Sequence, residues 1–167
     1  MKMVSLMKFA TIAFSVTASV SAMAAGSLVA DVTLNPAGDF KAKTSDVSGE
    51  ATVSGDTVKA DNIVVKLNKL VTGMPLRDRH AKEKYMEVNK YPEAVLTKAT
   101  GQGGKGKGML KFHGVEKEVS GTYKIEGNML KANFPIKLSD FKISGINYMG
   151  VGVEDEVKVE VSVPVKK

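Results

Sequence analysis

The sequence predicts an all-β fold, an antiparallel β-barrel of about eight strands with one helical insertion that caps an end. Three observations predict it. Apolar and polar residues alternate along most of the chain from Leu28 onward, as in strands with one buried face. Short turns that contain glycine or asparagine separate these segments, which is typical of antiparallel pairing rather than of crossover connections. A single segment, Thr72 to Glu93, has helical spacing instead.

The first 24 residues have the three parts of a secretory signal peptide. Lys2 and Lys8 precede an apolar run over residues 9–20, and the Ala-Met-Ala segment at 22–24 is a small-residue cleavage site. The run is too short to span a membrane. Cleavage would leave residues 25–167, which suits one domain, and would lower the formal net charge from +6 to +4. We therefore expect an exported protein with a cleaved signal peptide at 1–24 and a single domain at 25–167.

Strand patterns fill the chain before the helix. The expected strand segments cover residues 28–35, 40–44, 47–54 and 57–70. Turn signals occur at Asn35-Pro36 and at Ser54-Gly55-Asp56. In the strongest segment, Ile63, Val65 and Leu67 would share one face, because alternate residues of a strand point to the same side.

The helical insertion has recognisable start and stop signals. Pro75 suits the first helical turn, where its missing N–H would be unpaired anyway. Tyr91-Pro92 is expected to end the helix, because the residue before proline is disfavoured in the helical region. The apolar stripe at helical spacing consists of Met74, Ala81, Tyr85 and Val88. A lone helix among strands is expected to cover an end of the barrel.

Strand patterns resume after the helix around one glycine-rich stretch. The expected segments cover residues 94–100, 110–113, 118–125, 128–138 and 156–165. Gly101 to Gly108 resembles a phosphate-binding loop in spacing, but Gly108 stands where such a loop needs Ser or Thr, and a strand follows where a helix should. We interpret this stretch as a flexible hairpin loop.

The apolar face of each predicted strand needs a partner surface, which either a sandwich of two sheets or a closed barrel provides. The barrel is favoured for two reasons. The single helix is enough to cap one open end, and eight strands is the size at which a barrel can hold one small ligand.

Several function classes find no support in the sequence. Basic residues are scattered rather than gathered in a stripe with aromatics, so no nucleic-acid partner is expected. His80 and His113 are far apart and there is no cysteine, so no metal site is expected. The segment Arg77-Asp78-Arg79-His80 is either a solvated first helical turn or a polar rim at a barrel mouth. No catalytic residues are identified, and the chain is not expected to be an enzyme.

Motifs spread along the chain resemble the YceI-like family of exported polyisoprenoid-binding proteins. Thr72, the Arg77-Asp78-x-His80 motif and Tyr91-Pro92 are similar to that family's helical insertion. The segment 114–119 (GVEKEV) is similar to its strand-entry motif. The segment 138–143 (LSDFKI), followed by Asp155-Glu156-Val157 and alternating valines, is similar to its C-terminal third.

The resemblance implies a lipocalin-like barrel, secreted to the periplasm, that holds an isoprenoid chain such as a quinone or polyprenyl lipid in its bore. The expected ligand-lining residues are Ile63, Val65, Leu67, Leu110, Phe112, Tyr123, Ile125, Leu130, Phe134 and Ile136. The residues expected at the mouth are Arg77, Asp78, His80 and Tyr85. We expect no cofactor apart from such a lipid or quinone and no stable membrane insertion, and a homodimer is left open.

Two alternatives come from other function classes. In the first, the barrel is filled with side chains and the protein is a non-enzymatic periplasmic interaction or stress-response protein that acts through its loops. The small residues Ala132 and Gly121 at inward positions argue against complete filling. In the second, an enzyme acts on a bound lipid through His80, but no second catalytic group supports it.

Overall fold

A computed structural model describes residues 25–166 of the chain, and within them ten strands form one sheet. The predicted signal peptide, residues 1–24, lies outside these described residues. The strands are β1 (Gly26–Asn35), β2 (Asp39–Ser48), β3 (Ala51–Ser54), β4 (Thr57–Lys66), β5 (Glu93–Gln102), β6 (Lys105–Phe112), β7 (Val115–Glu126), β8 (Met129–Lys137), β9 (Asn147–Tyr148) and β10 (Val151–Lys166).

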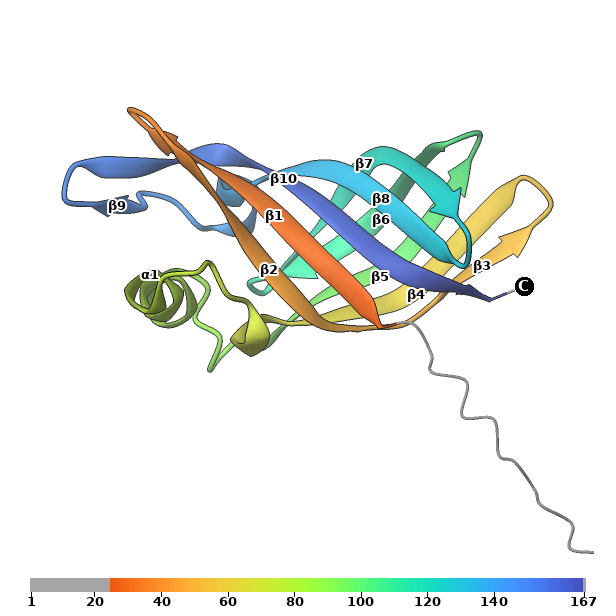
Figure 1. Cartoon of the computed structure of the whole chain (residues 1–167), viewed down its shortest axis with the longest axis horizontal. Helices are drawn as coiled ribbons and strands as arrows, with labels where there is room; N and C mark the ends of the chain where they lie inside the picture. Colours follow the sequence, from red (N-terminus) through yellow and green to blue (C-terminus); the bar gives the residue numbers. More distant parts are fainter. Residues whose placement is uncertain (1–24, 167) are drawn as a thin grey trace, which may run out of the picture.

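Eight of these strands close into an antiparallel barrel (Figure 1). Around the barrel their order is β1, β2, β4, β5, β6, β7, β8 and β10, and the pairing of β10 with β1 closes the ring. The short strand β3 pairs with β4 and lies parallel to the end of β10, and β9 pairs with the start of β10. The predicted all-β barrel of about eight strands is therefore confirmed.

The wall of the barrel is completed on one side by a loop. β2 and β4 pair at two positions, Val47 with Val65 and Ser48 with Val64, and then diverge. Beyond that point Lys43 of β2 exchanges two backbone hydrogen bonds with Val71, with N···O distances of 2.8 and 2.9 Å. The 3-10 helix η1 (Leu67–Lys69) and the residues after it therefore take the place of β4 beside β2.

The helical insertion is confirmed, but it is shorter than predicted. α1 (Pro75–His80) continues into η2 (Ala81–Tyr85), a π-helical turn, and the helical structure ends there rather than at Tyr91-Pro92. The backbone N–H of Met86 donates to the carbonyl of Ala81, and Glu87 then adopts a positive φ of 48°. This left-handed residue breaks the helical path before the proline can act. α1 lies beside one end of the barrel, next to β2 (Figure 1).

The glycine-rich stretch is strand rather than flexible loop, which corrects the sequence interpretation. β5 extends to Gln102 and β6 begins at Lys105, so the turn itself is Gly103-Gly104, both with positive φ. The aromatic ring of Tyr123 lies against Gly101, where a Cβ atom would come within 2.4 Å of it. Because Gly101 has no side chain, the Tyr123 ring can pack directly on the backbone of the strand. The glycine content of the segment alone does not distinguish this packing role from a flexible loop.

One group of deeply buried side chains lies at the end of the barrel opposite α1. Ala51 is fully buried, Val163 is 2% exposed, and Val58, Leu130 and Val161 pack with them. We call this the narrow end.

Candidate functional site

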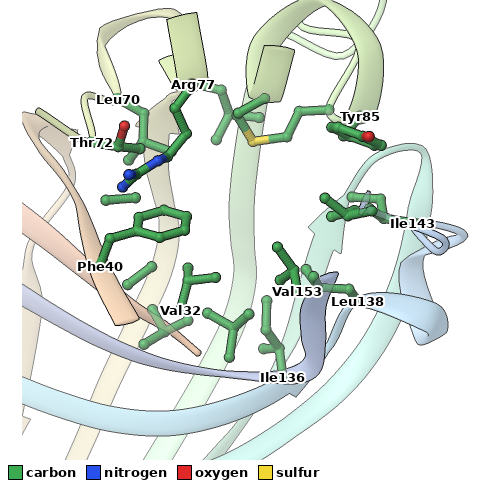
Figure 2. Close-up of a pocket in the computed structure, with 18 of the residues that line it drawn as sticks. Val32, Phe40, Leu70, Thr72, Arg77, Tyr85, Ile136, Leu138, Ile143 and Val153 are labelled. Atoms are coloured by element: carbon green, nitrogen blue, oxygen red, sulfur yellow. The ribbon is translucent and has the colours of Figure 1, made fainter. Parts of the chain in front are cut away.

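The end of the barrel beside α1 contains an apolar cavity of about 490 Å³ (Figure 2). This volume falls within the range of about 300–1,000 Å³ that is typical of small-molecule sites. Inward-facing residues of the barrel strands line it from below, and residues of α1, η2 and the η1 loop line it from above. Its mouth lies between α1 and the β9–β10 hairpin, both of which contribute exposed side chains to the lining.

The alternation along β1 explains one wall of this cavity. Its lining residues are every second residue of the strand, Leu28, Ala30, Val32 and Leu34. Registers across the barrel extend the same row, since Val32 is paired with Phe40 of β2 and with Val157 of β10. The lining predicted from the sequence did not include β1, β2 or β10, because the prediction was restricted to segments nearer the middle of the chain. The apolar alternation of β1 and β10 was nevertheless visible in the sequence.

The structure places most of the expected lining residues around this cavity. Ile63, Val65, Leu67, Leu110, Phe112, Phe134 and Ile136 contribute to it. Leu67 lies on η1 rather than on a strand, and it still faces inward. Tyr123 and Leu130 lie instead around a second, smaller cavity of about 80 Å³ at the narrow end.

Ile125 is a correction to the expected lining. It lines neither cavity, and it is 40% exposed. The register explains this position, because β6 begins at Lys105 opposite Thr122. Beyond Thr122, β7 extends past the end of β6. A side chain on the inward-facing side of β7 is therefore no longer covered by that strand.

Three residues stand between the two cavities. Ile63, Leu96 and Phe134 contribute to the lining of both. On the narrow side, the Tyr123 ring over Gly101 takes up space that glycine leaves free. The bore is therefore open beside α1, constricted in the middle and mostly filled at the narrow end.

Arg77 is the predicted mouth residue with the clearest contacts inside the cavity. Figure 2 shows its side chain extending from α1 toward Phe40, and the guanidinium carbon lies 4.1 Å from the centre of that ring. One guanidinium nitrogen also donates to the sulfur of Met74 at 2.7 Å. A guanidinium has five N–H donors, so donors remain for a ligand oxygen.

His80 and Tyr85 also line the cavity, on the same side as Arg77. The imidazole of His80 is stacked at a tilt on Tyr148 of β9, with ring centroids 5.5 Å apart. This contact joins the helical insertion to the β9–β10 hairpin. The two sides of the mouth therefore touch through aromatic rings.

Asp78, the fourth predicted mouth residue, does not line the cavity. Its carboxylate accepts hydrogen bonds from the backbone N–H of Thr72 at 2.7 Å and from the hydroxyl of Thr72 at 2.6 Å. Asp78 therefore holds the η1 loop against α1. The expected place of Asp78 at the mouth is therefore corrected, because its carboxylate binds Thr72, a lining residue, and Asp78 does not line the cavity itself.

His113 anchors the segment that follows the helical insertion. Its Nδ1 donates to the carbonyl oxygen of Phe141 at 2.8 Å, and its Nε2 lies 2.8 Å from a carboxylate oxygen of Glu87. Tyr91 packs edge-on against the imidazole, with ring centroids 4.7 Å apart. The His113 side chain is 9% exposed, so it joins the insertion to the barrel from a nearly buried position.

Two further findings concern the described residues alone. Within residues 25–166, no group of three or more His, Asp or Glu side chains is arranged to hold a metal ion. None of the helices in that part of the chain has the length and apolar character needed to cross a bilayer.

Comparisons with known proteins identify relatives of this chain. The family model of the YceI-like domain matches residues 14–165. Burkholderia cenocepacia BcnA has a similar structure, with a TM-score of 0.62 and 15% identity over 82% of this chain and 94% of that one. A polyisoprenoid binding domain from Saccharophagus degradans, implicated in plant cell wall breakdown, has a TM-score of 0.59 and 14% identity, and the match covers 84% and 93% of the two chains. No curated protein matches this sequence.

Proposed function

The chain belongs to the YceI-like family, as its motifs predicted, and we propose that it is a periplasmic lipid-binding protein that carries or sequesters a long isoprenoid chain in its barrel. The tail would occupy the cavity of about 490 Å³, and the head group would lie at the mouth. A quinone or a polyprenyl lipid has this shape. The Saccharophagus degradans domain is described as polyisoprenoid-binding, which supports an isoprenoid as the first lipid to test.

The observation that carries this proposal is the distribution of polar groups around the cavity. Among its described lining residues, those with polar side chains are Thr72, Arg77, His80, Tyr85 and Tyr148. All five come from the helical insertion, the loop before it, or β9, which lie at the mouth. The remaining lining residues are apolar. A ligand that fits has a long apolar body and one polar end.

Energetics assign different roles to the two parts of such a ligand. Burial of each methylene contributes about 0.8 kcal/mol before ordering costs, so each isoprene unit contributes several kcal/mol. A hydrogen bond at the mouth contributes about 0.5–1.5 kcal/mol, or somewhat more when it is charged. The tail therefore determines affinity, and Arg77 orients the head group by donating to a carbonyl or phosphate oxygen.

Export to the periplasm is part of the proposal and is supported by the sequence of residues 1–24. We expect the protein recovered from the periplasmic fraction to begin at Ala25. Intact-mass measurement and N-terminal sequencing would check this. Recovery of the whole chain from the cytoplasm would contradict it.

The lipid-carrier function can be tested with a variant that fills the cavity. Ala42 is buried and lines the cavity, so Ala42→Phe would place an aromatic ring where the tail is proposed to lie. Ile125→Phe adds a ring of the same type at a position outside both cavities. Organic extraction of wild type and both variants, followed by mass spectrometry, should recover an isoprenoid lipid from wild type and from the Ile125 variant and little from the Ala42 variant.

Two results would contradict the proposal. One is repeated recovery of wild-type protein without lipid, together with no binding of an added polyprenyl lipid. The other is equal lipid occupancy in folded Ala42→Phe and Ile125→Phe proteins.

The filled-barrel alternative receives less support, because the mouth end of the bore is open. Catalysis through His80 also has little support, since its contact with Tyr148 is between the two tilted rings, with centroids 5.5 Å apart, rather than a hydrogen bond to a proton-transfer partner. We therefore propose binding without catalysis. A screen for hydrolysis or oxidation of the extracted lipid, with wild type and His80→Ala compared, would test this.

A further inference from the structure

Most of the exposed large apolar side chains gather around the mouth of the cavity. Within residues 25–166 the exposed large apolar residues are Val71, Met74, Leu76, Ile125, Tyr148, Met149 and Val151, and of these Ile125 lies near the end of β7, away from the mouth. Five of them also line the cavity, and we call these five the apolar rim: Met74, Leu76, Tyr148, Met149 and Val151. Met149 is 86% exposed. Such a patch on a water-soluble surface indicates a binding site.

The apolar rim has two sides. Leu76 lies in α1 and Met74 is the residue just before it, and Tyr148, Met149 and Val151 come from the β9–β10 hairpin. Figure 1 shows both elements at the same end of the barrel, away from the C-terminal end of β10. The contact between His80 and Tyr148 holds the two sides together. The rim therefore forms one surface around the mouth.

Charges near the rim favour an anionic partner. The helical insertion, Pro75–Tyr85, contains four basic residues, Arg77, Arg79, Lys82 and Lys84. It contains two acidic residues, Asp78 and Glu83, and the first of these is engaged by Thr72. The hairpin segment 144–153 contains no charged residue. An uncharged apolar tip beside a basic helix is a pattern typical of proteins that bind the surface of an anionic bilayer.

We propose that the apolar rim docks onto the surface of an anionic lipid bilayer, so that the ligand enters the cavity directly from the membrane. This inference rests on the proposed function. The rim is continuous with the cavity lining, so an apolar chain that leaves the bilayer would stay among apolar side chains and avoid water. Tyrosine at the hairpin tip suits the boundary between lipid and water, where its ring and hydroxyl meet different environments.

Vesicle co-sedimentation tests the apolar part of this surface. The protein is used in the form that accumulates in cells, so wild type and variants carry the same N-terminus. The vesicles contain phosphatidylethanolamine and phosphatidylglycerol. Tyr148→Ser/Met149→Ser should weaken binding about tenfold, equivalent to about 1.4 kcal/mol. The control Ile125→Ser removes an exposed apolar side chain far from the rim and should bind like wild type.

A second pair of variants tests the charged part without changing the rim. Arg79→Gln/Lys84→Gln should weaken binding to the anionic vesicles about fivefold for each charge removed, and should have little effect on phosphatidylcholine vesicles. Lys105→Gln/Lys107→Gln removes two exposed charges from β6 and should bind like wild type. All variants are compared after thermal unfolding has shown that they are folded.

Several results would overturn the docking inference. The docking inference is overturned if wild-type protein does not sediment with anionic vesicles. If that protein nevertheless carries an isoprenoid lipid, the lipid-carrier function stands. Equal binding by the Tyr148/Met149 and Ile125 variants would also overturn the docking inference. The docking inference is also overturned if wild-type protein is a dimer in sedimentation velocity, the Tyr148→Ser/Met149→Ser variant is a monomer, and neither protein binds vesicles. Vesicle binding that depends on the rim, in a protein without lipid, would support docking and contradict the carrier function.

Discussion

The mouth end and the narrow end of this barrel are built from the same closed ring of strands, but their interiors differ. At the mouth, inward-facing leucine, valine and phenylalanine side chains surround a cavity of about 490 Å³. At the narrow end, the remaining space is about 80 Å³. Small inward residues do not leave that end empty, because the strands approach closely and the Tyr123 ring lies over Gly101. Side-chain size therefore does not by itself indicate where a barrel is open.

The difference comes from how the walls are completed. At the narrow end, β3 adds a further strand between β4 and β10. At the mouth, β2 diverges from β4. The η1 loop takes the place of β4 beside β2, and the helical insertion follows it. These segments contact the strands through a few specific bonds rather than a continuous ladder. The mouth end is therefore expected to open more easily than the narrow end.

The largest expected effect tests the close packing of the narrow end. A Cβ atom at Gly121 would lie 2.0 Å from the carbonyl oxygen of Asn133, so Gly121→Ala forces the backbone to move. We expect a loss of about 3 kcal/mol in the free energy of unfolding, measured in urea. The control at the mouth is Gly152→Ala, where the nearest atom would be 3.7 Å away and the change should stay within about 0.5 kcal/mol. Similar losses in both variants would contradict the difference between the ends.

The next effect concerns the anchor of the helical insertion. His113 has a positive φ of 50°, a conformation that asparagine also tolerates, so His113→Asn keeps the turn and removes the imidazole. The lost contacts to Glu87 and to the Phe141 carbonyl should cost about 2 kcal/mol. Hydrogen exchange should accelerate around residues 86–92 and 138–143. Acceleration that reaches β3 and the end of β10 equally would show that the two ends open together.

A smaller effect is expected at Asp78. Asp78→Ala removes two hydrogen bonds to Thr72, and we expect a loss of about 1 kcal/mol in stability. Because the bonds hold the η1 loop to α1, limited proteolysis should cut the segment 70–75 faster. Thr72→Val removes the hydroxyl bond alone and should give a smaller change. An Asp78 variant with unchanged proteolysis and altered lipid selectivity would restore the head-group role predicted from sequence.

The smallest effect is expected from acid. Hydrogen bonds from Lys124 and Lys131 lower the pKa of Glu126 to about 2 from its ordinary value of 4.5. Because the pKa is lowered in the folded state, the contribution to stability is complete above pH 4.5 and is lost as the pH falls toward 2. Glu126 is exposed at the surface, so the change is expected to be small and reduced by salt. Melting temperatures of wild type and Glu126→Gln at about pH 5 and about pH 2.5 should differ less at the lower pH.

A carboxylate near the mouth offers the matching measurement. Hydrogen bonds from the hydroxyl and backbone N–H of Ser139 lower the pKa of Asp155. Its contribution to stability is therefore also lost on acidification, as the pH falls below the ordinary value of 3.8. Asp155→Asn should remove that part of the acid response. A difference in melting temperature between wild type and either variant that is larger at about pH 2.5 than at about pH 5 would contradict the assignment of that group.

Local pattern was enough to predict much of this protein. The period of two along each strand determined which side chains point inward, so the inward positions of Ile63 and Val65 follow from the sequence alone. Proline and the change to helical spacing located the insertion. The motifs identified the family. These features are local because they depend on a residue and its near neighbours in the chain.

Only the tertiary structure decided where the bore is open and which polar groups face it. Ile125 is exposed because β6 begins late, and Asp78 faces Thr72 rather than the bore. Gly101 lies in a strand against the Tyr123 ring, although its segment has the composition of a loop. Each outcome depends on how far one strand extends past another and on side chains distant in sequence. A cavity is the volume that all eight strands and the insertion leave unfilled together, so no local pattern can specify it.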